Sequence, residues 1–509
     1  SQSVLLRFNC EDLLPKVPVN KYVTVTNYTL EHQLCRHLNL KENQAKYICM
    51  KYPVVRKLNE ETIKSLIETL AMCGYNKNVL HKEPAIFSIL PVTVKFRYKV
   101  LTECGFKNVL PSHILSYLSY VKKKTIGELK RTGEIANHIN VENKLASFLS
   151  CWPTSLTSNI YGDINEFTLY NLRLKIIQRY LELILDLSEE EFYRGVATYP
   201  TIKHRPLEVI NETIELLRNV IMMPNYKIKS NFYLIHADPE NLKEIIFKFR
   251  SIGGIDIKEI MRMYPKIAVK RCSALLEMRQ ILQKFKISDE AQCKCFHIYT
   301  LGPATLKERL EKAMKLPEFE TYFNHPRFLK MIHSNNTVIK RIANLNNNNK
   351  KCSTLNVLTG SSVSYKLFEK APGDRSGKGK DLVFCVSQCL KNLYSTHEIR
   401  NMLKRHPFWI NIPLVQVKYV YQKLSIEFSP EEIYENLPIL FYSWNKINDT
   451  LSTFNSEKGS CVQDQFDIIK INRSQKLSLV LYFLEKKHYF SGNGVWTEAE
   501  FKNQKSIAQ

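Results

Sequence analysis

The stretch IGGIDIKEIMRMYPKIAVKR, residues 252–271, predicts a short helix that a proline ends. It opens with a glycine pair, which permits the backbone angles of a turn. Its apolar residues then recur at helical spacing and define one helix face: Ile257, Ile260, Met261 and Tyr264. Proline has no N–H and disfavours helix in the residue before it, so the helix should stop near Tyr264. A second helix, residues 272–285, is expected to fold back on the first.

The same pattern recurs along most of the chain. Each copy has a capped turn, an acidic or polar first helical turn, apolar residues at helical spacing, then a proline and two more apolar residues. Further copies stand at residues 38–55, 73–87, 185–202, 285–306, 316–331, 393–410 and 428–441, with a looser one at 149–156. Such a unit cannot bury its apolar face alone, so neighbouring units must stack into one core. The repeats therefore predict an α-solenoid rather than an enzyme that happens to break its helices with proline.

The spacing between copies is only partly regular. Pro53 and Pro84 are 31 residues apart, as are Pro407 and Pro438, whereas Pro265 and Pro303 are 38 apart. A pentatricopeptide-type RNA reader requires helix pairs at a steady period. The drift and the prolines speak against that class.

Two motifs add a resemblance to a known family. LAMCGY (70–75) and LTECGF (101–106) share the pattern L-x-x-x-G-[FY], and x-x-P-x-[LIF] follows the short helices. Over about residues 34–484, this combination resembles the repeat of the mitochondrial transcription termination factor (mTERF) family, most like an insect member. The resemblance implies an all-α fold of right-to-left stacked mTERF-type helical repeats. These three-helix modules would form a superhelical solenoid whose concave basic groove grips nucleic acid.

The net charge points to a polyanionic partner. Lys and Arg number 73 against 49 acidic residues, which gives a charge of +24 and a pI of about 9.3. Double-stranded DNA and structured RNA are the usual partners of such a chain. A basic pI can also simply reflect the compartment of the protein. A membrane partner is not expected, because the longest apolar runs, 85–94 and 477–484, are far shorter than the ~20 residues of a span.

The cysteines and the N-terminus bear on the compartment. Thirteen cysteines are scattered without a framework spacing, which indicates reduced thiols in a reducing compartment. Residue 1 is serine, so we expect that a leader is already gone, and Glu11 and Asp12 make the first 30 residues unlike a transit peptide. A location in the mitochondrial matrix is therefore an implication of the family resemblance.

Composition divides the chain into five parts. We expect an N-terminal extension at 1–30, mTERF-type repeats at 31–343, a low-complexity flexible insertion at 344–381, further repeats at 382–490 and a tail at 491–509. The insertion is rich in Asn, Ser, Gly and Lys and poor in periodic apolar residues. Trp496 in the tail is expected to dock on the last module as a cap, because terminal repeats need one.

Several candidate chemical sites do not meet the requirements of their chemistry. The segment APGDRSGKGKD (371–381) has the wrong glycine spacing for a phosphate-binding loop and no hydroxyl residue after its lysine. Cys293, Cys295 and His297 lack the second ligand pair that structural zinc requires. Cys385 and Cys389 stand at the i, i+4 spacing of buried small residues. Paired carboxylates fall in first helical turns, where the helix dipole favours them. We therefore expect no enzyme, cofactor or metal.

Basic residues beside the module prolines form the candidate binding site. Each module should place its post-proline turn at an equivalent point, so these charges should line up and track a phosphate backbone, unless they only cover solvent-exposed edges. The candidates are Arg56, Lys57, Lys95, Arg97, Lys203, Arg205, Lys270, Arg271, Arg327, Lys330, Lys404 and Arg405. A further basic run, residues 122–131, is either a solvated face or a phosphate-binding edge.

The sequence therefore favours a mitochondrial protein that binds double-stranded mitochondrial DNA as a monomer and regulates or terminates transcription. One alternative is a ribosome-assembly factor that binds structured mitochondrial ribosomal RNA together with another mitochondrial protein. A third is a protein-interaction scaffold without nucleic acid, against which the net charge of +24 argues.

Overall fold

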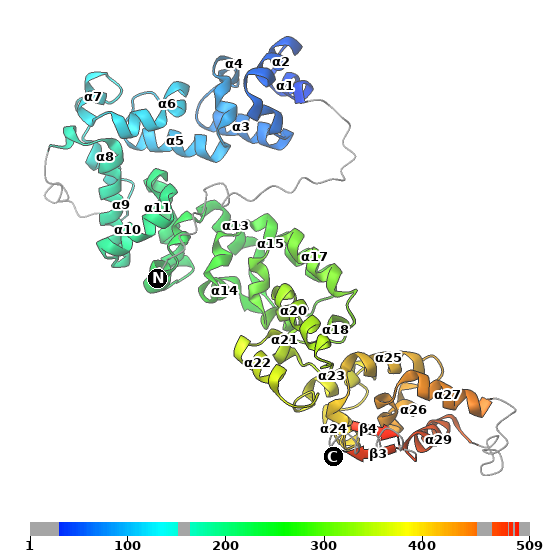
Figure 1. The fold of residues 1–509 in the computed structure, drawn as a ribbon. Helices are drawn as coiled ribbons and strands as arrows, with labels where there is room; N and C mark the ends of the chain where they lie inside the picture. Colours follow the sequence, from blue (N-terminus) through cyan, green and yellow to red (C-terminus); the bar gives the residue numbers. More distant parts are fainter. Residues whose placement is uncertain (1–29, 151–162, 456–470, 487, 492–493, 498–509) are drawn as a thin grey trace. The chain divides into compact units, whose positions relative to one another are not determined.

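The computed structural model describes residues 30–150, 163–455, 471–486, 488–491 and 494–497 (Figure 1). These residues fall into two compact units. Unit 1 contains the described residues up to Glu215 together with Pro224–His236, and unit 2 contains Leu216–Met223 and the described residues from Ala237 onward.

Unit 1 consists of α-helices joined by short helical turns. The η elements are five-residue 3₁₀ helices, except η5 and η11, which have three residues, and η3 and η7, which are π-helical turns. The elements are α1 Leu30–Leu38, α2 Glu42–Lys51, η1 Pro53–Lys57, α3 Glu60–Met72, α4 Val79–Lys82, η2 Pro84–Ser88, α5 Pro91–Glu103, α6 Pro111–Leu115, η3 Ser119–Lys123, α7 Ile126–Arg131, α8 Val141–Ala146, η5 Ile164–Glu166, α9 Leu169–Leu185, α10 Glu189–Thr198, η6 Pro200–His204, α11 Leu207–Glu215, α12 Asn225–Ser230 and η8 Phe232–His236.

Unit 2 has the same construction with two added hairpins, β1–β2 and β3–β4. Its elements are η7 Leu216–Val220, α13 Pro239–Phe249, β1 Ser251–Ile252, β2 Ile255–Asp256, α14 Ile257–Met263, η9 Pro265–Val269, α15 Cys272–Lys284, α16 Asp289–Cys293, η10 Phe296–Thr300, α17 Pro303–Ala313, α18 Pro317–Glu320, α19 Phe328–His333, α20 Asn335–Asn347, α21 Leu355–Thr359, α22 Ser362–Lys370, α23 Lys380–Cys389, α24 Thr396–Leu403, η11 Trp409–Asn411, α25 Leu414–Leu424, α26 Pro430–Glu435, η12 Leu437–Phe441, α27 Trp444–Asn455, α29 Arg473–Glu485, β3 His488–Ser491 and β4 Gly494–Thr497.

The stretch at 252–271 folds as its sequence predicts. Gly253 and Gly254 both have positive φ, 58° and 83°, and turn the chain between β1 and β2. Helix α14 ends at Met263, and Tyr264 is its C-cap in a non-helical conformation immediately before Pro265. Helix α15 then follows within one residue of the predicted bounds.

The repeat is a short helix followed by a 3₁₀ helix. In several copies a serine caps the short helix, as the capped turn predicts: Ser188, Ser288, Ser395 and Ser429. In four copies the residue before the proline has the same conformation, with φ near −125° and ψ of 65–84° at Tyr52, Glu83, Tyr199 and Tyr264. The clash between proline and a helical preceding residue explains this geometry. In the copy at 428–441, Pro438 is instead the second residue of η12. The all-α repeat fold is confirmed.

Pro303 does not occupy the repeat position that its sequence suggests. The 3₁₀ helix η10 begins at Phe296 without a proline, and Pro303 is instead the first residue of α17. Proline fits that position because the first N–H of a helix has no intrahelical partner. From Pro265 to Phe296 is 31 residues, so the expected drift to 38 disappears when equivalent positions are compared.

Within each unit, elements that follow one another in the chain pack together. Helices α13, α15 and α17 contact in succession, as do α23, α25, α27 and α29 (Figure 1). Their buried Ile, Leu and Val side chains form the core, which is what stacked modules require. None of the described helices is long and apolar enough to cross a membrane.

The segment 344–381, expected as a flexible insertion, contains helices. Thr354 and Ser361 cap α21 and α22, and Leu355 and Leu358 of α21 are fully buried. The loop after α22 is also held, because the carboxylate of Asp374 accepts hydrogen bonds from the backbone N–H groups of residues 351 and 352. These helices are too short for their apolar residues to show a clear helical periodicity. The polar composition of the segment therefore suggested a loop.

The tail and the loosest repeat copy lie at the limits of the described residues. Trp496 belongs to β4, which pairs with β3, and β3 contacts α29 of the last module. The copy at 149–156 lies outside the described residues from position 151 onward.

Gly195 in α10 tests the packing between modules. A Cβ atom there would lie 2.7 Å from the ring of Phe232 in η8. Alanine in a helix is usually more stable than glycine by about 1 kcal/mol, but this contact reverses the sign, and we expect Gly195→Ala to destabilise unit 1 by about 1–3 kcal/mol. Thermal unfolding measures the change. Gly302→Ala is the control: no atom lies within 4 Å of the added Cβ, so the substitution only replaces the N-cap glycine of α17 and should cost less than about 1 kcal/mol. An equal effect of both substitutions would contradict the packing argument.

Candidate nucleic-acid interface

Several arginines of the modules form hydrogen bonds to other helices of the protein instead of extending into solvent. Their guanidinium groups donate to carbonyl groups at the C-terminal ends of short helices, where carbonyls lack helical partners and a positive charge is favoured. The pairs are Arg97 with Ile114 (2.9 Å), Arg309 with Ile332 (3.1 Å) and Arg341 with Leu358 (3.0 Å). A basic residue in this repeat is therefore not by itself a nucleic-acid contact.

The predicted site residues differ in exposure. Arg56, Arg271, Lys330, Lys404 and Arg405 are exposed; Lys95, Arg97, Lys203, Lys270 and Arg327 are half-buried. Lys57 lies in η1, and its side chain is outside the described part of the structure. Arg205 is buried, with 5% of its surface exposed, and its guanidinium lies 5.3 Å from the ring centre of Phe96. Because it is buried, Arg205 is not available to contact nucleic acid.

Three other predicted residues already have polar partners. Arg56 donates to the carbonyl of Cys49 at 3.0 Å, and Arg327 donates to the side-chain oxygen of Asn356 at 2.7 Å. The ammonium of Lys270 donates to the carbonyl of Leu301 at 3.3 Å. Leu301 follows η10 as Lys270 follows η9, so this lysine joins equivalent positions of successive modules. Burial and the neighbouring Lys266 both lower the pKa of Lys270.

Unit 1 brings basic side chains from three elements around a pair of aromatic rings. The Lys122 ammonium in η3 lies 4.8 Å from the ring centre of Tyr170 in α9, and that of Lys203 in η6 lies 6.0 Å from it. The Tyr170 ring is also 5.8 Å from the ring of His204. Arg97 of α5 approaches the same place through Tyr117, whose hydroxyl is 3.2 Å from His204 Nδ1. We call Arg97, Lys122, Lys203, Tyr170 and His204 the basic patch.

The electrostatics of His204 show that the patch is strongly positive. Burial and, after it, the charges of Lys122, Arg173, Arg97 and Lys203 together lower the pKa of His204 to about 4. The imidazole is therefore neutral at neutral pH, while the surrounding ammonium and guanidinium groups remain charged. A site with this charge attracts phosphate groups.

A buried ion pair holds the elements of the patch together. Arg173 of α9 and Glu103 of α5, exposed by only 1% and 3%, lie 2.9 Å apart. Arg173 also donates to the carbonyl of Arg205 at 2.6 Å, and Glu103 accepts from the backbone N–H groups of Leu207 and Glu208 at 2.9 and 3.0 Å. The pair thus joins α5 and α9 to the end of η6 and the start of α11.

A comparison with known proteins finds a similar protein whose name agrees with the family that the repeat motifs resemble. Transcription termination factor 5, mitochondrial, of Drosophila melanogaster is 29% identical to this chain over 503 residues, which cover 96% of this chain and 87% of that protein. This similarity confirms the resemblance to the mTERF family that the repeat motifs predicted. No family model and no solved structure matches it.

In unit 2, the predicted cations lie on several repeat modules. Arg271 is the N-cap of α15, Lys330 belongs to α19, and Lys404 and Arg405 follow α24. Sequence reasoning missed Lys266, which is exposed in η9 and close enough to lower the pKa of Lys270. It missed Tyr170 in unit 1 as well. An aromatic residue near basic runs was the available signal for Tyr170.

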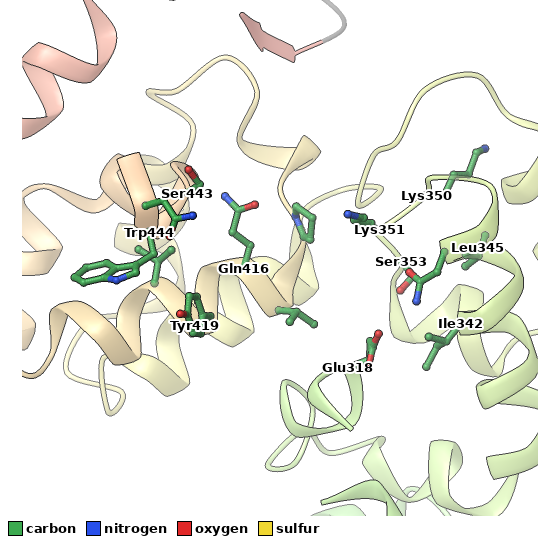
Figure 2. A pocket seen from close by; sticks show the side chains of 15 residues that line it. Glu318, Ile342, Leu345, Lys350, Lys351, Ser353, Gln416, Tyr419, Ser443 and Trp444 are labelled. Carbon is green, nitrogen blue, oxygen red and sulfur yellow. The ribbon is translucent and has the colours of Figure 1, made fainter. Parts of the chain in front are cut away.

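An open groove of about 550 Å³ lies between later repeat modules of unit 2 (Figure 2). Tyr419 and Trp444 line one side, and Ile342 and Leu345 of α20 line the other, with Lys351 and Gln416 between them. The ammonium of Lys350 points away from the groove and donates to the carbonyl of Phe368 at 2.8 Å. Such a mixture of apolar and polar side chains suits a small ligand. None of the predicted site residues lines the groove.

The rejected chemical sites have structural roles. The Cys293 thiol lies 3.2 Å from the carbonyl of Gly253, Cys295 is buried, and His297 is exposed. Among the described residues, no group of three or more His, Cys, Asp or Glu side chains is arranged to hold a metal ion. Gly379, in the loop that resembles a phosphate-binding loop, has φ of 70° and fits closely against Trp409.

His406 stands immediately before the module proline Pro407 and is a buried titratable group. It is 3% exposed, its Nδ1 accepts from the backbone N–H of Phe408 at 3.3 Å, and its Nε2 lies 3.4 Å from the Tyr442 hydroxyl. Burial lowers the pKa of His406 from 6.5 to about 4. Between these values the unfolded chain binds more protons than the folded chain, so stability decreases as the pH falls.

We therefore expect His406 to contribute about 2 kcal/mol to the loss of stability between pH 7 and pH 5. His204 and His236, both with pKa lowered to about 4, add to the loss in the wild type. Chemical denaturation at both pH values, for wild type and His406→Gln, isolates the share of His406. The amide keeps a donor toward Tyr442, and an unchanged pH dependence in this variant would contradict the assignment.

Proposed function

We propose that this mTERF protein binds double-stranded mitochondrial DNA in the matrix and regulates or terminates transcription there. The observation that carries the proposal is the basic patch of unit 1, where Lys122, Lys203 and Arg97 surround Tyr170 and His204. The similar Drosophila protein is named as a mitochondrial transcription termination factor, and the similarity extends over 96% of this chain. The net charge of +24 agrees with a polyanionic partner.

Phosphate contacts supply most of the affinity in this mechanism. Each lysine or arginine that neutralises a phosphate releases condensed counterions, and the binding constant then falls steeply with salt. In unit 2, the exposed Arg271, Lys330, Lys404 and Arg405 supply further contacts of this kind. Phosphate contacts fix position and orientation, whereas sequence preference comes from base edges and from the deformability of the duplex. A protein bound in this way obstructs a transcribing polymerase.

The test compares tiled duplexes of the mitochondrial genome with structured mitochondrial ribosomal RNA, each across a salt titration. The proposal expects one duplex to bind at least about a hundredfold more tightly than the others, with a steep salt dependence. A run-off transcription assay with that duplex then measures whether bound protein shortens the transcripts.

Other outcomes would overturn the proposal in distinguishable ways. Tighter binding to the ribosomal RNA than to every duplex would make the protein an RNA-binding ribosome-assembly factor. If this protein binds neither nucleic acid more tightly than a generic protein of equal charge does, it is an interaction scaffold. Specific duplex binding without shortened transcripts would retain the DNA partner and exclude termination.

A further inference from the structure

A second cavity in unit 2 contains a pair of thiols. It has a volume of about 360 Å³ and lies where α23 and α25 meet the turn after α18. Cys385 and Cys389 line it from successive turns of α23, together with Lys391, and Lys418 lines it from α25. None of the residues proposed above to bind nucleic acid takes part, so the chemistry of this cavity is a separate question.

The two thiols are not equivalent. Cys385 is 2% exposed and hydrogen-bonded to Cys389, which is half-buried and accessible from the cavity. Cys385 keeps its proton and donates it, because this hydrogen bond raises the pKa of Cys385 and lowers the pKa of Cys389. The ammonium of Lys418 lowers the pKa of Cys389 further. An ion pair of 2.9 Å with Glu320 and a hydrogen bond to the Glu320 carbonyl hold that ammonium in place.

Cys389 differs from the other cysteines that the structure describes. Burial raises the pKa of Cys49, Cys73, Cys104, Cys272, Cys293, Cys295 and Cys352. The thiolate is the nucleophile in thiol chemistry, and a nearby cation and a hydrogen-bond donor are the features that stabilise it. Cys293 and Cys35 are also half-buried, and they provide internal comparisons of similar exposure.

We propose that the cavity is a thiol-modification site in which Cys389 exchanges with a low-molecular-weight disulfide that carries carboxylates. The Cys389 thiol first loses its proton to solvent. Its thiolate sulfur then attacks one sulfur of the disulfide, a new S–S bond to Cys389 forms, and the original S–S bond breaks. The second half of the reagent leaves as a thiolate and takes up a proton. Two cations, Lys391 and Lys418, line the cavity against the single carboxylate of Glu320, and this net positive charge favours anionic over cationic reagents.

The test incubates the full chain with glutathione disulfide, which is anionic, and in parallel with cystamine, which is cationic. Samples are quenched with an alkylating agent, and peptide mapping by mass spectrometry measures the modified fraction of each cysteine over time. We expect glutathione disulfide to modify Cys389 at least about threefold faster than Cys293 or Cys35, because the larger thiolate fraction outweighs the lower nucleophilicity of a more acidic thiol. We expect a smaller preference for Cys389 with cystamine.

Variants separate the proposed causes. Cys385→Ser keeps an O–H donor and should leave the rate at Cys389 within about twofold, whereas Cys385→Ala removes the donor and should slow it. Lys418→Met should slow the reaction with glutathione disulfide more than the reaction with cystamine. Thermal unfolding of each variant checks that the fold is kept. Equal rates at Cys389 and Cys293, or no effect of Lys418→Met, would overturn the proposal, and neither result depends on nucleic-acid binding.

Discussion

Replacing Arg173 by methionine is expected to destabilise unit 1 by about 3 kcal/mol. The substitution leaves the carboxylate of Glu103 buried, at 3% exposure, without its cationic partner. Breaking a buried pair from one side costs about 3–5 kcal/mol because the remaining charge is uncompensated. The lower end applies here, since Glu103 keeps the backbone N–H donors of Leu207 and Glu208. Denaturant unfolding followed by a probe in unit 1 measures the change.

The same helix offers a matched control. Arg179 of α9 forms an ion pair of 3.2 Å with Glu182, but its side chain is 44% exposed. Arg179→Met should therefore cost less than about 1 kcal/mol. Adding Glu103→Gln to Arg173→Met should restore part of the stability, because the neutral amide still accepts from the N–H groups and buries no charge. Equal losses for Arg173→Met and Arg179→Met would contradict a structural role of the buried pair.

The repeat was predictable because local sequence signals determine it. The proline after α14 excludes a helical conformation at Tyr264 whatever surrounds it, so the helix end could be placed from sequence alone. Where the proline is missing, as before η10, a 3₁₀ helix still forms after Cys295, which has φ of −152° and ψ of 67°, and the sequence pointed to Pro303 instead. The helices α21 and α22 were missed because their stability comes from caps and from contacts with other elements.

The site was less predictable because it depends on contacts between modules. Position after a proline could not separate Arg205, which is buried, from Lys203 two residues earlier, which lies beside Tyr170. Lys122 belongs to a different module, and only the packing of η3 and η6 against α9 brings the two lysines to one ring. Whether a cation binds a carbonyl, as Arg97 does, also depends on distances that the sequence does not contain.

Neutralising the two lysines of the basic patch, Lys122→Gln with Lys203→Gln, is expected to weaken duplex binding about 60-fold at ~0.1 M salt. Each lysine that neutralises a phosphate contributes about 0.9 to the slope of log K against log salt, which corresponds to about eightfold at that concentration. The slope should therefore fall by about 2 in the double variant. The Lys122 side chain is exposed and that of Lys203 is half-buried, so thermal unfolding should change little.

The control removes the same charge elsewhere in unit 1. Lys82 and Lys107 are exposed and are not among the cations that shift the pKa of His204. Lys82→Gln with Lys107→Gln should change the affinity by less than about fourfold, because it reduces the general field without removing a phosphate contact. If both double variants weaken binding equally, net charge rather than the basic patch determines affinity, and the DNA contact must be sought on unit 2. A loss confined to the Lys122 and Lys203 variant, at every duplex sequence alike, would instead identify the patch as a contact to phosphate rather than to bases.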